Sequence, residues 1–503
     1  MGQGDLNWWE RRATIVALTL FAMVPLLWPT VPPLVDLPGH MGRYRVELDG
    51  AGSVLRQFYE FHWALVGNLG VDLLIVPMAW VFGLELGVKL IVIAIPALTV
   101  LGMLWIAREV HGRIPPNTLF ALPLAYNVPL LFGFVNFALS MALALLAFAL
   151  WLRLARLDRL QLRAIVFLVI SPLIWITHTY GLGFLGILAF SAELVRHHDR
   201  GESWPGSFVK AAIGCFVLTP PIIFMLVVPS GAALGNTGDW LNWSAKREAV
   251  SVILRDRWFC FDALSRALLA ALIVFAIVSS RLVFAKKLAV SALLLLATCI
   301  VLPRVTFGGS FTELRLAPFA LAVAIIAIAP AKAASARFVN ALAIIGLVFF
   351  GVRMAANAMS LAMASARQEQ ALAALDHLPV GSRLISFTNA SWTDRMEHLA
   401  GMAIVRRRSF SNDQWNLTGL NLMSVVKNDA PGFDSDPSQT VTAKVADSGG
   451  LVLPIDAALS RFPRNAFDYL WLINPPAYDT GLTRGMTPVW RDGADVLFRI
   501  DHK

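Results

Sequence analysis

The sequence predicts an all-α polytopic membrane bundle of about 11–13 transmembrane helices, followed by a small C-terminal α/β domain. Hydrophobic residues make up 57% of the 503 residues and charged residues only 15%, whereas soluble domains are about 45–50% apolar and about 25% charged. Apolar runs close to membrane-spanning length recur as far as residue 358. After Met363 the chain becomes polar, and its apolar runs shorten to strand length.

The charge pattern supports a membrane protein rather than a nucleic-acid-binding one. The formal net charge is +9, but the basic residues lie in short runs between apolar stretches. Cytoplasmic loops of membrane proteins have this pattern, so no nucleic-acid partner is expected. The three cysteines are too scattered for a disulfide framework or a metal cluster. We expect no cofactor, and the residues do not indicate a divalent metal.

Twelve apolar runs are each expected to form a helix, because backbone at bilayer depth must satisfy its own hydrogen bonds. The first run follows Arg11 and Arg12, is too long for a signal-peptide core and lacks a cleavage site. It is therefore expected to be an uncleaved helix whose N-terminus is cytoplasmic. The runs are 13–33, 64–83, 86–107, 118–133, 136–152, 164–176, 180–195, 208–228, 264–280, 288–303, 316–331 and 338–358.

The placement of Lys and Arg predicts the orientation of these helices. Four basic linkers, 153–163, 196–200, 281–287 and 332–337, are expected in the cytoplasm. The loops 229–262 and 304–315, and everything after about residue 360, are then expected on the other side.

This orientation requires an odd number of crossings, whereas twelve runs are present. Either one run before Arg153 is re-entrant or lies on the surface, or a long one contains two crossings. The segments 127–129 and 133–136 are typical of a broken helix near one membrane face. Eleven and thirteen spans both remain open.

The predicted domains are a membrane domain over 1–360, with a first external loop over 34–63, and a periplasmic α/β domain over 361–503. A helix over 362–378 is expected to lead into the α/β domain, and 428–438 is expected to be a loop. Strands are expected over 381–387, 402–405, 469–473 and 496–500.

The richest group of ionisable residues follows the first helix. Asp36 would lie where that helix leaves the membrane, and Pro38 and Gly39 favour a turn. An amphipathic surface helix is then expected over 40–55, with His40 and Arg43 on one face. From the residues alone, this is either an Asp–Arg pair that orients the helix or part of a functional site.

Other candidate binding residues lie at the predicted external ends of helices. Arg304, Glu313 and Arg315 lie near one such end, where Arg315 either has a binding role or pairs with Glu313 or extends to the interface. His178 and Tyr180 follow a span, where the histidine is either a binding residue or a structural group. His62 follows the first-loop helix and would line the same binding cavity as these residues.

Several of these segments together resemble the GT-C superfamily of integral-membrane glycosyltransferases, and in particular a little-characterised bacterial branch. They are the Asp-x-Pro-x-His-x-x-Arg string at Asp36, Gly-Phe-Val-Asn-Phe at 133–137, His178, Glu-Leu-Arg-Leu-Ala-Pro at 313–318 and Phe-Asp-Tyr at 467–469. The resemblance implies an inverting enzyme that takes a sugar from a polyprenyl-phosphate carrier.

The resemblance also implies roles for individual residues. Asp36 matches the first-loop acid, which acts as general base on the acceptor hydroxyl or positions it, with His40 and Arg43 as supports. Arg315 matches the basic residue that holds the lipid-linked phosphate, and Arg304 is a second candidate. His178, with Tyr180 beside it, would contact the sugar or phosphate. Many members place a second acid beside the first, whereas Leu37 occupies that position here.

The expected partners are therefore a polyprenyl-phosphate-linked sugar, membrane lipid, and an extracytoplasmic glycan, lipid or protein acceptor. The expected location is a bacterial inner membrane. A transporter or flippase for lipid-linked saccharides would instead place charges along a path at mid-membrane depth and show repeat symmetry. A catalytically inactive scaffold of the same fold, serving envelope polysaccharide assembly, is a further alternative.

Overall fold

The computed structural model describes residues 6–227, 237–306, 309, 311–416, 421–426, 429–443 and 452–502. The chain forms two compact units. The first, unit 1, contains residues 1–27, 65–71 and 91–359, and the second, unit 2, contains residues 28–64, 72–90 and 360–503. The helices α3 (Gly70–Phe82), α4 (Leu84–His111) and α15 (Ala336–Leu372) have residues in both units.

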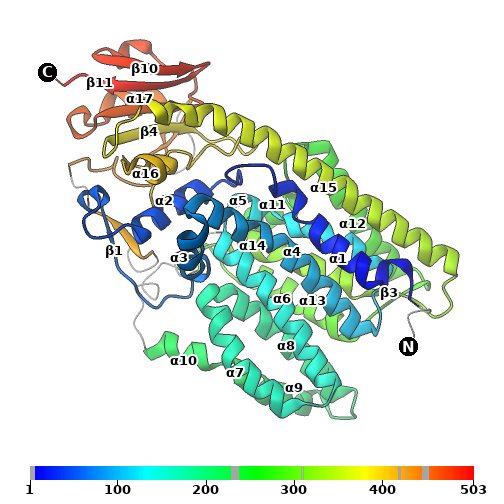
Figure 1. The fold of residues 1–503 in the computed structure, drawn as a ribbon. Coiled ribbons are helices and arrows are strands. Elements are labelled where there is room, and N and C mark those ends of the chain that lie inside the picture. The colour runs from blue at the N-terminus through cyan, green and yellow to red at the C-terminus, as the bar shows by residue number, and fades with distance from the viewer. Residues whose placement is uncertain are drawn as a thin grey trace. The chain divides into compact units, whose positions relative to one another are not determined.

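Unit 1 is built almost entirely of helices (Figure 1). Its short elements are the 3-10 helices η2 (Trp8–Glu10), η3 (Val24–Leu26), η5 (Pro116–Phe120), η6 (Leu122–Tyr126) and η7 (Phe216–Leu218) and the paired strands β2 (Leu282–Phe284) and β3 (Ile328–Pro330). Its remaining α-helices are α1 (Arg12–Phe21), α5 (Val128–Phe132), α6 (Val135–Arg156), α7 (Leu160–Thr177), α8 (Thr179–His198), α9 (Trp204–Cys215), α10 (Pro220–Val227), α11 (Trp243–Ser251), α12 (Phe259–Val278), α13 (Lys286–Val301) and α14 (Thr312–Ile326).

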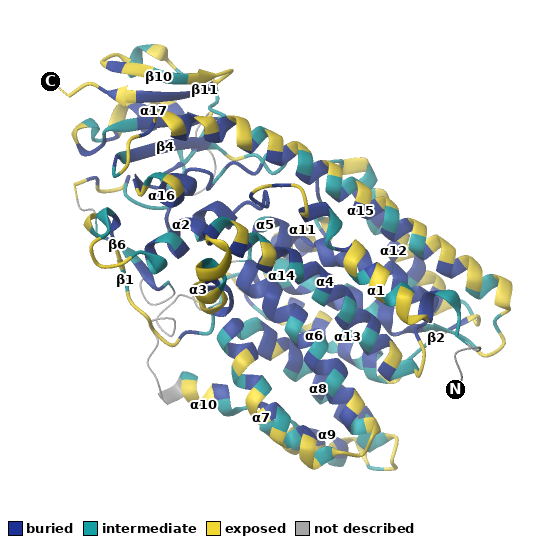
Figure 2. Cartoon of the chain, viewed as in Figure 1, coloured by how far each residue is buried: buried dark blue, intermediate teal, exposed yellow. Residues whose placement is uncertain are grey.

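The centre of unit 1 is a packed group of helices in which α8 contacts α6 and α13, and α13 contacts α14. The most apolar stretch of α6 is 83% buried, whereas the corresponding stretches of α7 and α12 are only 33% and 28% buried (Figure 2). Helices that stay apolar on an exposed face are typical of proteins whose surroundings are lipid.

The length and composition of the helices are also compatible with a membrane protein. Among the described residues, five helical stretches are long and apolar enough to cross a membrane: Leu84–His111, Val135–Arg156, Leu160–Thr177, Phe259–Val278 and Ala336–His377. Three shorter apolar helical stretches accompany them: Arg12–Leu26, Gly70–Phe82 and Trp204–Leu218. The chain is therefore mainly helical, with several apolar helices that are compatible with a membrane protein.

The apolar run over 118–133 forms three short helical pieces rather than one helix. A proline lies in the first turn of each piece, η5, η6 and α5. Proline has no N–H to donate, so it suits the first turn of a helix and interrupts a longer one. Gly133 ends α5 with φ of 96°, a left-handed conformation that glycine adopts without a steric penalty. The broken helix predicted near Pro129 and Gly133 is present.

Unit 2 combines an opening segment of the chain with its C-terminal part. Its helices besides the shared ones are α2 (Leu37–Leu48), η4 (Val54–Gln57), η9 (Ala373–His377), α16 (Gly401–Arg407), α17 (Ile455–Arg461), η10 (Arg464–Ala466) and η11 (Thr480–Thr483). Its strands are β1 (Tyr59–Phe61), β4 (Arg383–Asn389), β5 (Phe410–Ser411), β6 (Met423–Val425), β7 (Thr440–Thr442), β8 (Leu453–Pro454), β9 (Tyr469–Ile473), β10 (Met486–Asp492) and β11 (Asp495–Ile500).

The main sheet of unit 2 is mixed and has the order β10-β11-β9-β4-β7-β8, with β5 also paired to β4. The strands β9, β5 and β7 run parallel to β4, whereas β11 runs antiparallel to both β9 and β10. Strands predicted at 381–387, 469–473 and 496–500 correspond to β4, β9 and β11. The prediction of a strand at 402–405 is wrong, because these residues lie in α16. Of the loop predicted over 428–438, residues 429–438 form turns and bends, as expected, and Asn428 lies outside the described residues.

The first loop and the C-terminal segment are joined by backbone pairing. Strand β1 pairs antiparallel with β6, with Glu60 opposite Ser424. Helix α2 also packs against α16 at very short range, since a Cβ atom on Gly401 would lie 2.6 Å from the carbonyl oxygen of Pro38. Only a residue without a side chain allows this approach.

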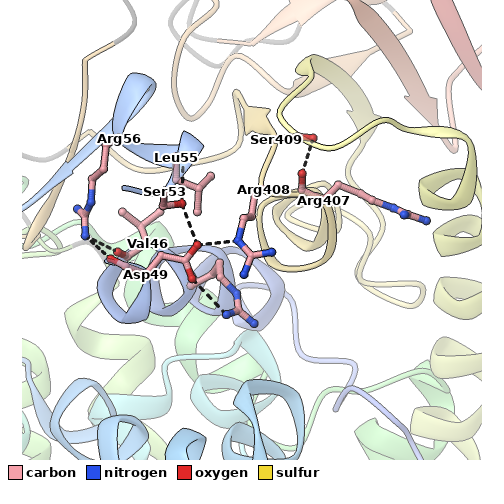
Figure 3. A network of polar contacts seen from close by, with 9 residues as sticks. Val46, Asp49, Ser53, Leu55, Arg56, Arg407, Arg408 and Ser409 are labelled. Atoms are coloured by element: carbon pink, nitrogen blue, oxygen red, sulfur yellow. Dashed lines mark hydrogen bonds and ion pairs between the residues drawn. The ribbon is translucent and has the colours of Figure 1, made fainter. Parts of the chain in front are cut away.

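Polar contacts at the end of α2 reinforce this junction (Figure 3). The Asp49 carboxylate accepts hydrogen bonds from Ser53 at 2.9 Å and from Arg408 Nε at 2.8 Å. Arg56 donates to the carbonyl oxygens of Asp49 at 2.6 Å and Val46 at 3.1 Å. The turn after α2 is thereby tied to the end of α16.

The helix after Asp36 differs from the amphipathic surface helix expected over 40–55. It begins at Leu37 and ends at Leu48, and most of its residues are buried. Gly39 packs closely against Trp415, and Gly42 against Gln414 and Ile404, so residues of the C-terminal segment cover this helix. The turn expected at Pro38 and Gly39 is instead the first turn of this helix, where proline is well tolerated.

Candidate functional site

The candidate residues fall into two groups, one in each unit. Asp36, His40, Arg43 and His62 lie in unit 2, and Arg315, Arg304, Glu313, His178 and Tyr180 lie in unit 1. Each group is described within its own unit.

Asp36 faces a histidine that was not a sequence candidate. Its Oδ1 atom lies 3.8 Å from Nε2 of His398, and Oδ1 of Asp436 lies 3.9 Å from the same nitrogen. The other ring nitrogen of His398, Nδ1, lies 3.0 Å from the carbonyl oxygen of Asp413. Asp36 and His398 are 8% and 5% exposed, so the carboxylate and the imidazole form a nearly buried acid–base pair.

The acidic surroundings favour the protonated form of His398. Burial by itself lowers the pKa of His398, but the negative charges of Asp36, Asp436 and Asp413 outweigh it, so its pKa is raised above the ordinary value. A protonated imidazole beside Asp36 stabilises the ionised carboxylate, which is the form that a general base requires.

Trp415 connects His398 to His40. The centroid of the Trp415 ring system lies 4.4 Å from the ring centroid of His398 and 4.8 Å from that of His40. A Cβ atom on Gly39 would lie 2.9 Å from the Trp415 ring and 3.3 Å from Cβ of His398. Gly39 therefore packs against Trp415. His40 also contacts Trp415, which in turn contacts His398.

Arg43 belongs to a buried ion pair. Its guanidinium lies 2.8 Å from Oδ1 of Asp72 and donates a hydrogen bond to Oδ1 of Asn421 at 2.7 Å. Burial raises the pKa of Glu47, one turn further along α2, to about 8, with Asp72 adding to the effect and Arg43 opposing it. The sequence interpretation paired Arg43 with Asp36, but the acid that forms an ion pair with Arg43 in the structure is Asp72, and the Asp36 side chain makes no capping hydrogen bond to this helix.

His62 lies just after β1 in an exposed position. Its side chain is 78% exposed, and its Nε2 lies 3.5 Å from the Glu60 carboxylate. Its backbone N–H donates to the carbonyl oxygen of Leu422 at 2.9 Å.

In unit 1, Arg315 is surrounded by aromatic rings. Its guanidinium carbon lies 4.0 Å from the ring centroid of Phe134, 5.5 Å from that of Phe137 and 5.8 Å from that of Tyr180. Stacking on aromatic faces fixes the plane of a guanidinium, and its five N–H donors point outward in that plane. The structure therefore brings Arg315 together with Tyr180 and with both phenylalanines of the 133–137 motif.

His178 and Tyr180 mark the break between α7 and α8. The Nδ1 atom of His178 accepts a hydrogen bond from the Tyr180 N–H at 3.2 Å and so caps α8. The Tyr180 hydroxyl lies 2.7 Å from Oγ1 of Thr312, at the start of α14. The rings of His178 and Phe137 are in edge contact, with centroids 5.6 Å apart. His178 is therefore a capping residue as well as a neighbour of the Arg315 group.

Asn136, in the same motif, organises an irregular segment of unit 1. Its side chain accepts from the N–H of Val71 at 2.6 Å and donates to the carbonyl oxygen of Asn68 at 2.8 Å. The N–H of Leu69 donates to the carbonyl oxygen of Ile176 at 2.7 Å. The motif over 133–137 thus positions both the aromatic rings around Arg315 and the chain beside α7.

Arg304 and Glu313 flank the beginning of α14. The guanidinium of Arg304 lies over the Phe311 ring at 5.3 Å, and its carbonyl oxygen accepts from Thr312 Oγ1 at 3.3 Å. Glu313 is 3% exposed, and its Oε2 atom has no hydrogen-bond partner among the residues that the structure describes.

Sequence reasoning did not identify His398, Trp415 and Asp436. His398 and Asp436 lie in turns of the polar C-terminal region and Trp415 lies in an irregular segment of it, and no sequence motif marks any of them. The charge of Asp36 indicates that a partner residue should lie nearby, but which residue that is depends on the packing of α2 against α16. Within the described ranges, no group of three or more His, Cys, Asp or Glu residues is arranged to hold a metal ion.

No protein-family model matches the chain, and a search of curated proteins found no match. The GT-C resemblance therefore stays a prediction from the sequence.

The pairing of His398 predicts a pH-dependent stability. Because its pKa is higher in the folded protein, the pairing contributes fully below the unfolded value of about 6.5 and is lost as pH rises through the folded value. Thermal unfolding of the wild type and of His398→Gln, measured between pH 5.5 and 8.5, should show a stability difference that shrinks with rising pH.

The exposed His62 provides the matched control. His62→Gln should unfold like the wild type throughout this pH range, because its imidazole is largely surrounded by solvent. A His398→Gln difference that grew with pH would contradict the assigned pairing.

Proposed function

We propose that the protein is an integral-membrane glycosyltransferase. It transfers a sugar from a polyprenyl-phosphate carrier to an acceptor hydroxyl outside the cytoplasm, in a bacterial inner membrane. The observation that carries the proposal is the nearly buried pair of Asp36 and His398, with carboxylates 3.8 Å and 3.9 Å from one imidazole nitrogen. A buried histidine whose pKa is raised by neighbouring carboxylates is the kind of perturbed group that is concentrated at catalytic sites.

In the proposed reaction Asp36 is the general base. The acceptor hydroxyl transfers its proton to Asp36 while its oxygen forms a bond to C1 of the sugar. The bond between C1 and the phosphate oxygen breaks, and its electron pair leaves with the polyprenyl phosphate. His398 acts on Asp36 as a positioning residue, because an imidazolium beside the carboxylate keeps it available as a base.

The leaving phosphate needs a positive group, and we assign this role to Arg315. A planar guanidinium holds two phosphate oxygens at once and stabilises the charge that develops as the carrier departs. The aromatic rings of Phe134, Phe137 and Tyr180 support the assignment, because they hold the guanidinium plane in one orientation.

The activity can be tested with purified protein in liposomes that contain polyprenyl phosphates carrying radiolabelled hexoses or N-acetylhexosamines. We expect release of free polyprenyl phosphate with label moving to an acceptor or to water. Movement of the intact labelled lipid between leaflets without release would instead identify a flippase. Neither release nor movement for any donor would favour an inactive scaffold.

Arg315→Gln should lower kcat/KM for the lipid-linked donor about ten- to a hundredfold, since a hydrogen bond to a charged group is worth about 1.5–3 kcal/mol. The measurement is the initial transfer rate as a function of donor concentration. Arg281→Gln is the matched control, because Arg281 also lies over an aromatic ring, Phe338, at 5.6 Å. An unchanged kcat/KM in Arg315→Gln would remove the assigned role.

A further inference from the structure

Unit 1 contains a second site with charged residues, away from the Arg315 group. A cavity of about 270 Å³ lies among α7, α8 and the α9–η7 segment. One part of its lining is charged and comes from Arg163, Glu193, Arg196 and His197. The rest is almost entirely apolar.

The charged lining carries an excess of positive charge. Glu193 lies 2.5 Å from Nη1 of Arg163 and 2.9 Å from Nη2 of Arg196. Two guanidinium groups thus share one carboxylate, and His197 Nε2 lies 4.0 Å from the same group. The Trp151 ring, 3.9 Å from the guanidinium carbon of Arg163, fixes that side chain further. A built, net-positive site of this kind favours an anion.

Donors for an anion are present at the cavity. The Nε and Nη1 atoms of Arg196 are buried and have no hydrogen-bond partner among the described residues. Leaving such donors unsatisfied costs free energy, more so for a charged group. A phosphate oxygen would satisfy them.

The apolar part of the lining distinguishes a lipid from a free anion. Leu160, Ala164, Ile213 and Val217 line the cavity beside the charged residues. A phosphate ion gains nothing from such a surface, whereas the glycerol and first methylene groups of a lipid are stabilised by it.

The position on the helices also fits a lipid headgroup. Arg163 is in the first turn of α7 and Arg196 in the last turn of α8, within two linkers that the sequence predicts to be cytoplasmic. Lys286, at the start of α13, lies 2.9 Å from Asp199 in the same region. Anionic lipids are concentrated in the cytoplasmic leaflet, and basic pockets between membrane helices bind their headgroups.

We propose that the cavity lined by Arg163, Arg196 and His197 binds the phosphate-bearing headgroup of an anionic phospholipid. The phosphate contacts the guanidinium edge of Arg196, and the glycerol region lies against Leu160 and Ile213. This site is independent of the proposed sugar transfer.

Native mass spectrometry of the detergent-purified full chain tests the proposal. Phosphatidylglycerol and cardiolipin should each bind at least tenfold more tightly than phosphatidylcholine. Arg196→Gln should weaken this binding about tenfold, as expected for one lost charge-assisted contact. Arg153→Gln is the matched control, because Arg153 pairs with Glu109 at 3.6 Å and does not line the cavity.

A second variant fills the site without changing charge. A Cβ atom on Gly214, which lines the cavity, would meet only Glu193, at 3.8 Å and 3.9 Å. Gly214→Leu should therefore fold and prevent lipid binding by occupying the space.

The proposal is overturned if phosphatidylcholine binds as tightly as phosphatidylglycerol, or if both variants bind lipid like the wild type. Phosphatidylglycerol should raise the unfolding temperature of the purified chain, whereas inorganic phosphate at the same phosphate concentration should not. If inorganic phosphate raised the unfolding temperature as much as the lipid does, the cavity would be a free-anion site, and the lipid assignment would be overturned.

Discussion

Asp36→Asn is expected to abolish sugar transfer, with a loss of at least about a thousandfold, while the protein stays folded. General acid–base catalysis contributes about 10²–10⁴-fold, and an amide of nearly the same shape cannot accept the proton. The measurement is the rate of polyprenyl phosphate release in liposomes, together with the elution profile and unfolding temperature of the variant.

A matched substitution separates catalysis from general effects of charge. Asp376 is an acidic residue of the same unit whose side chain is 81% exposed and pairs with Arg407 at 2.8 Å. Asp376→Asn should transfer sugar at the wild-type rate. Full activity in Asp36→Asn would remove Asp36 from the mechanism.

His398 should act only through Asp36. If so, adding His398→Gln to Asp36→Asn should cause no further loss of rate, although His398→Gln alone should slow transfer. An additive loss would assign His398 an independent contact with the substrate.

The second large effect is expected on stability, at the buried pair of Arg43 and Asp72. The two side chains are 4% and 0% exposed. Removing one partner of a buried pair leaves an uncompensated charge and costs about 3–5 kcal/mol. Arg43→Met should therefore strongly lower the stability of the protein against thermal and denaturant-induced unfolding.

Two further variants serve as controls for this prediction. Arg43→Met combined with Asp72→Leu removes both charges and should recover most of the lost stability. Arg408→Gln removes the partially exposed pair with Asp49, in which Arg408 is 46% exposed, and should cost only about 0–1 kcal/mol. If Arg43→Met unfolds like the wild type but loses activity, Arg43 supports catalysis rather than the fold.

Much of the helical unit could be predicted because its signal is local. Long apolar runs such as the one that forms α6 specify a helix by length and composition. The prolines that begin η5, η6 and α5 explain why one run over 118–133 forms three short pieces. Strands β4, β9 and β11 were likewise predicted from short apolar runs.

The errors arose where local sequence is ambiguous. A four-residue apolar run such as Met402–Val405 fits a buried strand or a short buried helix equally well. Packing against α2 decides for a helix here, and Gly401 allows that contact. The same packing buries the helix after Asp36, whose sequence was interpreted as amphipathic.

For the candidate site, the sequence indicated which charged residues to consider but not which residues they contact. Asp36 and Arg315 were identified because charged residues beside apolar helices are expensive. His398 and Asp72 were not, because each meets its partner through contacts between distant parts of the chain. Such pairings depend on the whole fold rather than on spacing.

The pairing of β1 with β6 has a consequence for how the protein is made. Strand β1 (Tyr59–Phe61) leaves the ribosome early, whereas β6 (Met423–Val425) belongs to the last fifth of the 503 residues. Until then, the backbone of Tyr59–Phe61 presents an open strand edge of the kind that associates with other chains. The opening loop therefore cannot complete its strand pairing until most of the chain has been synthesised.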